Sequence, residues 1–89
     1  MLSSEIIIVN KLGLHARAAA KFVSLASTFD SEISLGRNGH TVNGKSIMGV
    51  MMLAAAKGTA LELHARGSDE ELALQQLKQL VAERFGEEE

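Results

Sequence analysis

The sequence of 89 residues contains no cysteine, proline, tryptophan or tyrosine, and only three phenylalanines. Without cysteine there is no disulfide framework, which is consistent with a reducing cytosol. Few aromatic side chains leave little surface for stacking nucleic-acid bases, and the net charge of −2 does not suit a polyanionic partner. The N-terminal segment lacks a basic stretch followed by a long apolar run. These absences predict a cytoplasmic protein that binds neither nucleic acid nor membranes.

The length and the distribution of charge limit how the chain can be organised. A chain of 89 residues suffices for one small domain, and no repeat, low-complexity tract or flexible linker divides it. We therefore expect a single domain over residues 1–89. Residues 1–68 carry a net charge of +3, whereas residues 69–89 carry −5. The last three glutamates, Glu87 to Glu89, are expected to form a solvated tail.

Four segments are predicted to be strands, because apolar or β-branched residues recur in them at short intervals. These segments are residues 5–9, 32–35, 40–43 and 59–66. Asn38 and Gly39 both tolerate the positive φ of a type I′ turn, so the second and third segments should form a hairpin. In the last segment the side chains predicted to point inward are Leu61, Leu63 and Ala65, and those predicted to point outward are Glu62, His64 and Arg66.

Three segments have the spacing of amphipathic helices: residues 16–28, residues 47–56 and a segment that begins near Ser68. Ser46 is placed as the N-cap of the second helix, and Ser68 with Glu71 forms a capping-box pattern for the third. The side chains predicted to be buried on the first and third helices are Ala19, Ala20, Val23, Ala26, Leu74, Leu77 and Val81. The order βαββαβα indicates an α+β fold, a four-stranded antiparallel sheet with three helices on one face.

The segment Gly13-Leu14-His15-Ala16-Arg17 carries the strongest functional signal, because a glycine turn brings one histidine to the start of an alanine-rich helix. The first N–H groups of a helix have no partner inside it, and the aligned peptide dipoles add partial positive charge there. Arg17 adds a guanidinium group that matches phosphate oxygens. The arrangement suits a histidine that carries phosphate, with the amides of Ala16 and Arg17 close to the anion.

Other interpretations of His15 stay open at this point. A histidine at a helix start is commonly a surface or capping residue without chemistry. A Ser-His-Asp set is assembled in space and leaves no spacing to recognise, and nothing in the sequence favours it. A metal site is disfavoured because His40 and His64 lack metal-ligand spacing to His15 and there is no cysteine. We expect no metal and no cofactor, and assign no role to His40 or His64.

The segment from Ile47 to Leu53 is apolar almost all round. If Val50 and Leu53 point inward, an exposed apolar patch remains, consisting of Ile47, Met48, Met51 and Met52. Such a patch on a small domain usually marks a binding surface, and methionine suits several partners. The alternative is that all four are core residues covered by loops. Ser46 needs no role beyond capping, but a phosphate there would be favoured by the helix N-terminus and would lie beside the patch.

Taken together, Gly13-Leu14-His15-Ala16-Arg17 and Lys45-Ser46-Ile47-Met48 resemble the active-site and regulatory-serine segments of the HPr family. These are the histidine phosphocarrier proteins of bacterial phosphoenolpyruvate-dependent phosphotransferase systems. The resemblance implies an open-faced β-sandwich and a carrier without catalytic turnover of its own. In such a carrier His15 would accept phosphate on Nδ1 from Enzyme I and pass it to EIIA-type domains, while Arg17 and the amide of Ala16 would hold the phosphoryl group.

The same resemblance implies that Ser46 is a target for HPr kinase/phosphorylase, and that a monomer docks successive partners through Ile47, Met48, Met51 and Met52. Ala18 stands where family members commonly have proline, so the helix should form with a less rigid start. Two alternative functions remain. The chain could be a regulatory interaction module that acts through binding and Ser46, or a nitrogen-branch paralogue that uses the histidine relay for signalling instead of sugar uptake.

Overall fold

A computed structural model describes all residues, 1–89, as one sheet packed against helices. The elements follow the predicted order βαββαβα, with a short 3-10 helix added at the end. They are β1 (Leu2–Ile7), α1 (Ala16–Ala26), β2 (Glu32–Arg37), β3 (His40–Asn43), α2 (Ile47–Met52), β4 (Ala60–Arg66), α3 (Glu70–Ala82) and η1 (Arg84–Gly86).

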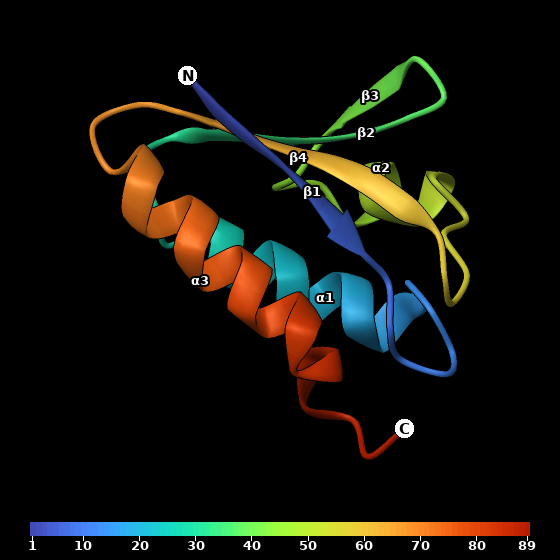
Figure 1. The fold of residues 1–89 in the computed structure, drawn as a ribbon. Helices are drawn as coiled ribbons and strands as arrows, with labels where there is room; N and C mark the ends of the chain where they lie inside the picture. Colours follow the sequence, from blue (N-terminus) through green and yellow to red (C-terminus); the bar gives the residue numbers. More distant parts are fainter.

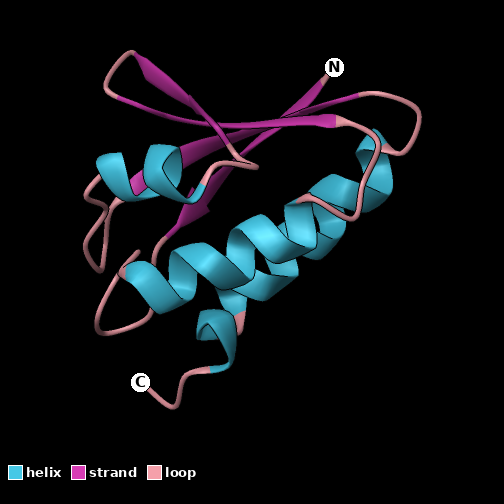
Figure 2. Cartoon of the chain, turned by 180° about the vertical axis from the view of Figure 1, so that it is seen from behind, coloured by secondary structure: helices cyan, strands magenta, loops and turns pink.

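The sheet is antiparallel throughout, with the strand order β1-β4-β2-β3. Strand β4 lies between β1 and β2, and β3 returns beside β2 through the predicted hairpin. In that turn Asn38 and Gly39 have φ values of 52° and 83°, as a type I′ turn requires. All three α-helices lie on the same face of the sheet, and the opposite face is open (Figure 1, Figure 2). The predicted α+β architecture is confirmed.

The core lies between the covered face of the sheet and the helices. Strand β4 shows the alternation that builds it, because Leu61, Leu63 and Ala65 are buried whereas Glu62 and Arg66 are exposed. The α1 and α3 side chains in the same core are Ala18, Ala19, Phe22, Ala26, Ala73, Leu77 and Val81. Removal of this apolar surface from water is the main favourable contribution to folding.

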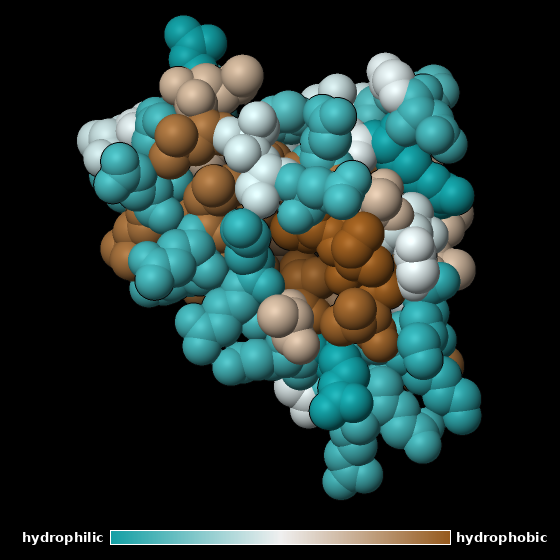
Figure 3. Space-filling model, viewed as in Figure 1, coloured by the Kyte–Doolittle hydropathy of each residue, from teal (hydrophilic) through white to brown (hydrophobic).

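Seen from the side of Figure 1, the surface is mainly polar, with an apolar area where the end of β1 meets the helices (Figure 3). Ile7 and Val9, at the end of β1 and just beyond it, are 42% and 38% exposed. The chain ends at the lower edge of this view, away from the sheet. None of the helices has the length and apolar character needed to cross a bilayer.

Helix α2 is shorter than predicted, since it stops at Met52 and not at residue 56. Ala54 has a φ of 49°, which ends the helical backbone. Nη1 of Arg37, from the neighbouring hairpin, donates hydrogen bonds to the carbonyl oxygens of Leu53 (2.6 Å) and Ala54 (3.1 Å). A side chain distant in sequence thus satisfies carbonyl groups at the end of this helix, which local spacing does not reveal.

Strand pairing and helix packing also make the bounds of β1 and α1 differ from the predicted ones. The first strand covers Leu2–Ile7 instead of residues 5–9, because its serines pair with β4. Helix α1 ends at Ala26 and not at residue 28. Its buried face includes Ala18 and Phe22, whereas Ala20 and Val23, predicted to be buried, remain partly exposed. A helix with alanines on several sides has no sharp apolar stripe, so contact with the sheet decides which face is buried.

The predicted capping box of Ser68 and Glu71 is wrong. Helix α3 begins at Glu70, with Asp69 as its N-cap, and the carboxylate of Asp69 makes no bond to its own helix. That carboxylate instead accepts hydrogen bonds from the N–H groups of Asp30 (2.9 Å) and Ser31 (3.0 Å). The carboxylate of Asp69 therefore binds the loop before β2 instead of the first turn of α3. Along the helix, Ala73 is buried and the predicted Leu74 is only partly buried.

Candidate functional site

The loop between β1 and α1 brings His15 to the start of α1. Gly13 has a φ of 68°, and a Cβ atom at this position would lie 2.4 Å from the carbonyl oxygen of Ala55. The next residue, Leu14, donates its N–H to the same oxygen at 2.9 Å. Nδ2 of the fully buried Asn10 donates to the carbonyl oxygen of Gly13 at 2.8 Å. The loop is therefore held against the segment after α2, and only glycine fits at its tightest point.

His15 is the N-cap of α1, with extended backbone (φ −72°, ψ 176°), and its side chain makes no capping hydrogen bond. The N–H groups of Ala16, Arg17 and Ala18 donate to no other protein atom, and the first helical bond runs from Ala19 to the carbonyl oxygen of His15. Three free donors and the positive end of the helix dipole thus lie beside a partly exposed imidazole. This is the arrangement of an anion site at a helix N-terminus.

The C-terminal segment, expected to be a solvated tail, folds back onto this site. Arg84 and Phe85 both have positive φ, 59° and 55°, so η1 reverses the direction of the chain after α3. The ring of Phe85 is then buried in the core, and its carbonyl oxygen accepts a hydrogen bond from Nζ of Lys21 at 2.7 Å. The prediction of a solvated tail is correct for the exposed Glu88 and Glu89 but wrong for Glu87. It overlooked the apolar side chain of Phe85, which anchors the segment.

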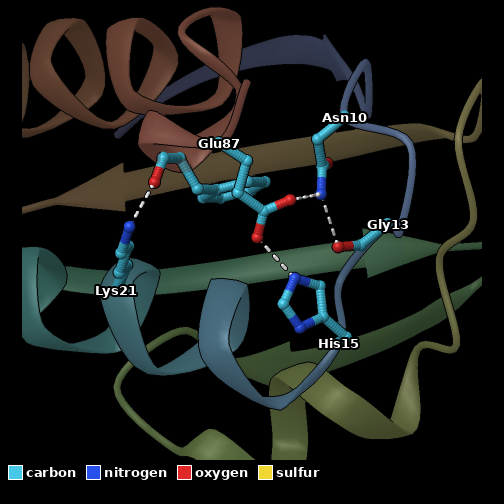
Figure 4. A network of polar contacts seen from close by, with 6 residues as sticks. Asn10, Gly13, His15, Lys21 and Glu87 are labelled. Atoms are coloured by element: carbon cyan, nitrogen blue, oxygen red, sulfur yellow. Dashed lines mark hydrogen bonds and ion pairs between the residues drawn. The ribbon is translucent and has the colours of Figure 1, made fainter. Parts of the chain in front are cut away.

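Glu87 is the residue that this fold-back brings to the histidine. Its Oε2 lies 2.5 Å from Nε2 of His15, and its Oε1 accepts a hydrogen bond of 3.0 Å from Nδ2 of Asn10 (Figure 4). The hydrogen bond from Asn10 is the largest cause of the lowered pKa of Glu87. The hydrogen bond and charge of His15 and the charge of Lys21 act in the same direction, against desolvation. The carboxylate is therefore ionised at neutral pH.

Three basic side chains, those of Lys11, Arg17 and Lys21, lie near His15 in the sequence, and the structure gives two of them partners. Nζ of Lys11 lies 3.3 Å from Oε2 of Glu89, and Lys21 is engaged by the carbonyl of Phe85. Arg17 has no ion pair or hydrogen-bond partner, and it lines a shallow depression together with Lys11 and the three terminal glutamates. Of these three basic side chains, Arg17 is thus the one without a hydrogen-bond or ion-pair partner in the protein.

The second predicted site, at the start of α2, is built differently. Ser46 is the N-cap, as predicted, and its Oγ accepts a hydrogen bond from the N–H of Gly49 at 3.1 Å. Val50 and Leu53 are buried. The predicted patch is exposed, by 43% at Ile47, 76% at Met48, 41% at Met51 and 78% at Met52. The alternative in which these residues form core is therefore wrong, and the patch lies on a helix that packs against α1.

The other two histidines lie away from this site. His40 is exposed at the start of β3. His64 is partly exposed on β4, with its Nε2 3.3 Å from Oε2 of Glu62. No group of three histidine, cysteine, aspartate or glutamate side chains has the arrangement of a metal site.

The fold is an open-faced α+β sandwich, and its site is a histidine beside free helix-start amides that can receive an anion. A family model described as the PTS HPr component phosphorylation site matches residues 2–83. The chain belongs to the HPr family of phosphocarrier proteins, components of the bacterial phosphotransferase system.

Individual relatives resemble the chain over its whole length. Phosphocarrier protein HPr of Neisseria meningitidis serogroup B is 56% identical over 89 residues, and HPr of Pseudomonas aeruginosa is 56% identical over 90 residues. In both comparisons the match covers all of both proteins. The crystal structure of HPr-C-His from Thermoanaerobacter tengcongensis has a TM-score of 0.96 at 47% identity, again over all of both chains.

Asn10 and Glu87 are the residues of the site that sequence reasoning missed. Asn10 resembles an ordinary turn residue after a strand, and Glu87 an ordinary residue of an acidic end. A useful signal was present in Phe85, a large apolar side chain between Arg84 and Gly86 just beyond the last helix. An isolated aromatic residue in a polar tail indicates that the tail is anchored to the core.

Proposed function

We propose that this chain carries a phosphoryl group on Nδ1 of His15, accepted from phosphorylated Enzyme I and passed to an EIIA-type domain. The observation that supports this most directly is the position of the imidazole at the start of α1. Its Nδ1 has no hydrogen-bond partner in the protein, and the amides of Ala16, Arg17 and Ala18 are free to receive an anion. Membership of the HPr family supports the same assignment.

In the proposed transfer, the lone pair on Nδ1 forms a bond to the phosphorus atom of the donor. The bond between phosphorus and the donor atom of Enzyme I breaks, and its electron pair returns to that atom. The equatorial oxygens carry negative charge throughout, so free amides and the guanidinium of Arg17 stabilise the group being transferred. Transfer to the acceptor repeats the step with the roles exchanged, so the chain acts as a cytoplasmic carrier and has no turnover of its own.

The exposed apolar patch of α2 would dock these partners beside the histidine, with the carrier acting as a monomer. In cells that contain HPr kinase/phosphorylase, Ser46 would be the regulatory target. A phosphate on its Oγ would remain at the helix N-terminus and would add about two negative charges next to Ile47 and Met48. Such charge would weaken docking of apolar or acidic partner surfaces.

The test is intact mass spectrometry at alkaline pH after incubation with phosphoenolpyruvate and Enzyme I, on the parent protein and on His15→Ala. We expect one acid-labile phosphoryl adduct on the parent and none on the variant. No adduct on the parent with a competent Enzyme I from the same cell would contradict the carrier function. It would favour the regulatory module, which depends on Ser46.

A further inference from the structure

The two carboxylate oxygens of Glu87 contact two different side chains, those of His15 and Asn10 (Figure 4). One oxygen faces Nε2 of His15 and the other accepts from Nδ2 of Asn10. Nδ2 of Asn10 also donates to the carbonyl oxygen of Gly13, and Asn10 is completely buried. The amide that orients Glu87 is thus the same amide that holds the loop carrying His15, so the two residues are aligned by one rigid group.

The tail is anchored on both sides of Glu87. Before it, Phe85 is buried and its carbonyl accepts from Lys21. After it, the carbonyl oxygen of Glu89 accepts the backbone N–H of Lys11 at 2.8 Å. Ordering a chain end costs conformational entropy, and these contacts offset that cost independently of the histidine. The position of the carboxylate is therefore determined before any phosphoryl group arrives.

The contact decides which nitrogen of His15 carries the proton. An ionised carboxylate can only accept hydrogen bonds, so Nε2 must be the donor. A neutral imidazole with its proton on Nε2 has its lone pair on Nδ1. In Figure 4 the second ring nitrogen faces away from Glu87, and it has no hydrogen-bond partner in the protein. The nitrogen left as a nucleophile is the one that the carrier function requires.

We propose that Glu87 is a positioning residue for phosphoryl transfer, which holds His15 in the Nε2–H tautomer and stabilises the charge that its ring acquires. This inference rests on the proposed carrier function. It assigns a role to a carboxylate that belongs to the C-terminal segment and lies outside the signature around His15.

The chemistry of the step shows why this position is useful. The Nδ1 lone pair forms the nitrogen–phosphorus bond, while the bond from phosphorus to the donor breaks and its electron pair remains with the donor. No proton has to leave Nδ1, because the tautomer holds the proton on Nε2. The phosphorylated ring then carries positive charge that is shared with Nε2–H, and the Glu87 carboxylate lies against that group. An aspartate beside the histidine of a serine protease triad stabilises its ring in the same way.

The test compares Glu87→Gln with Glu88→Gln in the full-length protein. Glutamine retains the shape of Glu87 but has a single acceptor oxygen, so it can satisfy only one of the donors on Asn10 and His15. Glu88 is exposed and has no ion pair or side-chain hydrogen bond, so its substitution changes the net charge equally without touching the histidine. Circular dichroism and thermal unfolding establish that both variants are folded.

Two quantities are measured for each protein. The first is the pair of ¹⁵N chemical shifts of the His15 ring at alkaline pH, which reports the tautomer without any phosphoryl donor. The second is the rate constant for phosphorylation by phosphorylated Enzyme I, in single turnovers over a range of concentrations. We expect Glu87→Gln to populate the other tautomer and to lower the saturating rate constant about tenfold, the smaller of the losses seen when a metal-bound histidine loses its outer hydrogen-bond partner. The half-saturating concentration should not change, and Glu88→Gln should match the parent in both quantities.

Each other outcome has a distinct meaning. Phosphorylation of the parent on His15 with unchanged shifts and rate in Glu87→Gln would overturn the inference and leave the carrier function intact. A faster rate in Glu87→Gln would also overturn it, because the carboxylate would then act by repelling phosphate. A slower rate with unchanged ring shifts would show a merely structural role. A parent that a competent Enzyme I cannot phosphorylate would remove the carrier function, and with it the inference.

Discussion

Helices α1 and α2 pack against each other, and their N-termini use opposite solutions to the same problem. Helix α2 begins at Ser46, whose own Oγ accepts a hydrogen bond from Gly49. Helix α1 begins at His15, whose side chain turns away to Glu87 and leaves three backbone amides without a partner. The start of α2 thus supplies a side-chain acceptor of its own, whereas the start of α1 has none. The comparison shows how one fold can hold a structural cap and an anion site on adjacent helices.

The start of α2 is thus built for stability, whereas the start of α1 leaves donors free for the proposed function. Unpaired donors at a helix start forgo the stabilisation that a side-chain cap provides, about 1 kcal/mol. At α1 that loss is compensated by contacts from other parts of the chain, namely Ala55, Asn10 and Glu87. Substitutions at the two helix starts should therefore have separable effects on stability and on phosphoryl transfer.

The largest effect is expected for Gly13→Ala, which breaks the support of the α1 start. A Cβ atom there would meet Ala55 O at 2.4 Å in a backbone of positive φ, so the loop carrying His15 must move. We expect a loss of about 3 kcal/mol in the free energy of unfolding, measured by urea denaturation. Phosphorylation by Enzyme I should also slow.

Gly39→Ala is the matched control for this change. Gly39 also has positive φ, but nothing lies within 4 Å of a Cβ atom at that position. It should lose only about 1 kcal/mol, from backbone strain alone, with phosphorylation unaffected. Equal losses in the two variants would show that contact with Ala55 does not support the site.

At the α2 start, Ser46→Ala should lower the free energy of unfolding by about 1 kcal/mol, because the amide of Gly49 loses its acceptor. Ser24→Ala, an exposed serine within α1 without a side-chain hydrogen bond, should change it by less than about 0.5 kcal/mol. Neither variant should alter the rate at which His15 is phosphorylated in vitro. A slower phosphorylation in Ser46→Ala would mean that the two helix starts are coupled.

Ala18→Pro sharpens the comparison on the α1 side. The N–H of Ala18 has no partner in the protein, so proline removes no hydrogen bond and restricts the backbone of the first turn. We expect a gain of about 0.5 kcal/mol in stability and a change in the transfer rate or in the lifetime of the phosphohistidine. Thermal unfolding and the decay of the phosphorylated protein measure these quantities, and no change in either rate or lifetime would exclude a role for the additional amide.

The third helix start, α3, should show a pH dependence in the acid range. The hydroxyl of Ser31 is the largest cause of the lowered pKa of Asp69, followed by the N–H of Asp30. Because the folded-state pKa lies below the ordinary value of 3.8, the stabilisation is present above that value and is lost as pH falls through the folded-state pKa. Asp69→Asn should flatten this part of the curve of stability against pH, measured by urea unfolding at successive pH values. An unchanged curve would assign the acid dependence to Glu70 and Glu87, whose pKa values are also lowered.

Much of the fold follows from short-range patterns. Alternation in residues 60–66, the Asn38-Gly39 turn and the serine before α2 each depend on neighbours a few residues away, and each was predicted correctly. The C-terminal end of α2 and the start of α3 were not, because Arg37 and Asp69 act between elements that are distant in sequence. Local patterns cannot report which distant partner will claim a polar group.

Although it left open whether the apolar side chains of α2 are exposed, the amino-acid sequence by itself determined the order of the elements and the placement of His15 and Ser46 at helix starts. It did so because helix and strand periodicity, turn chemistry and capping are encoded within a few residues. Only the tertiary structure decided the surroundings of the histidine. Glu87 lies 72 positions from His15 along the chain, and the burial of Phe85 together with the amide of Asn10 brings its carboxylate to Nε2. The His15 tautomer that we infer, and with it the proposed nucleophilic nitrogen, thus depends on packing at the far end of the chain, which no local pattern specifies.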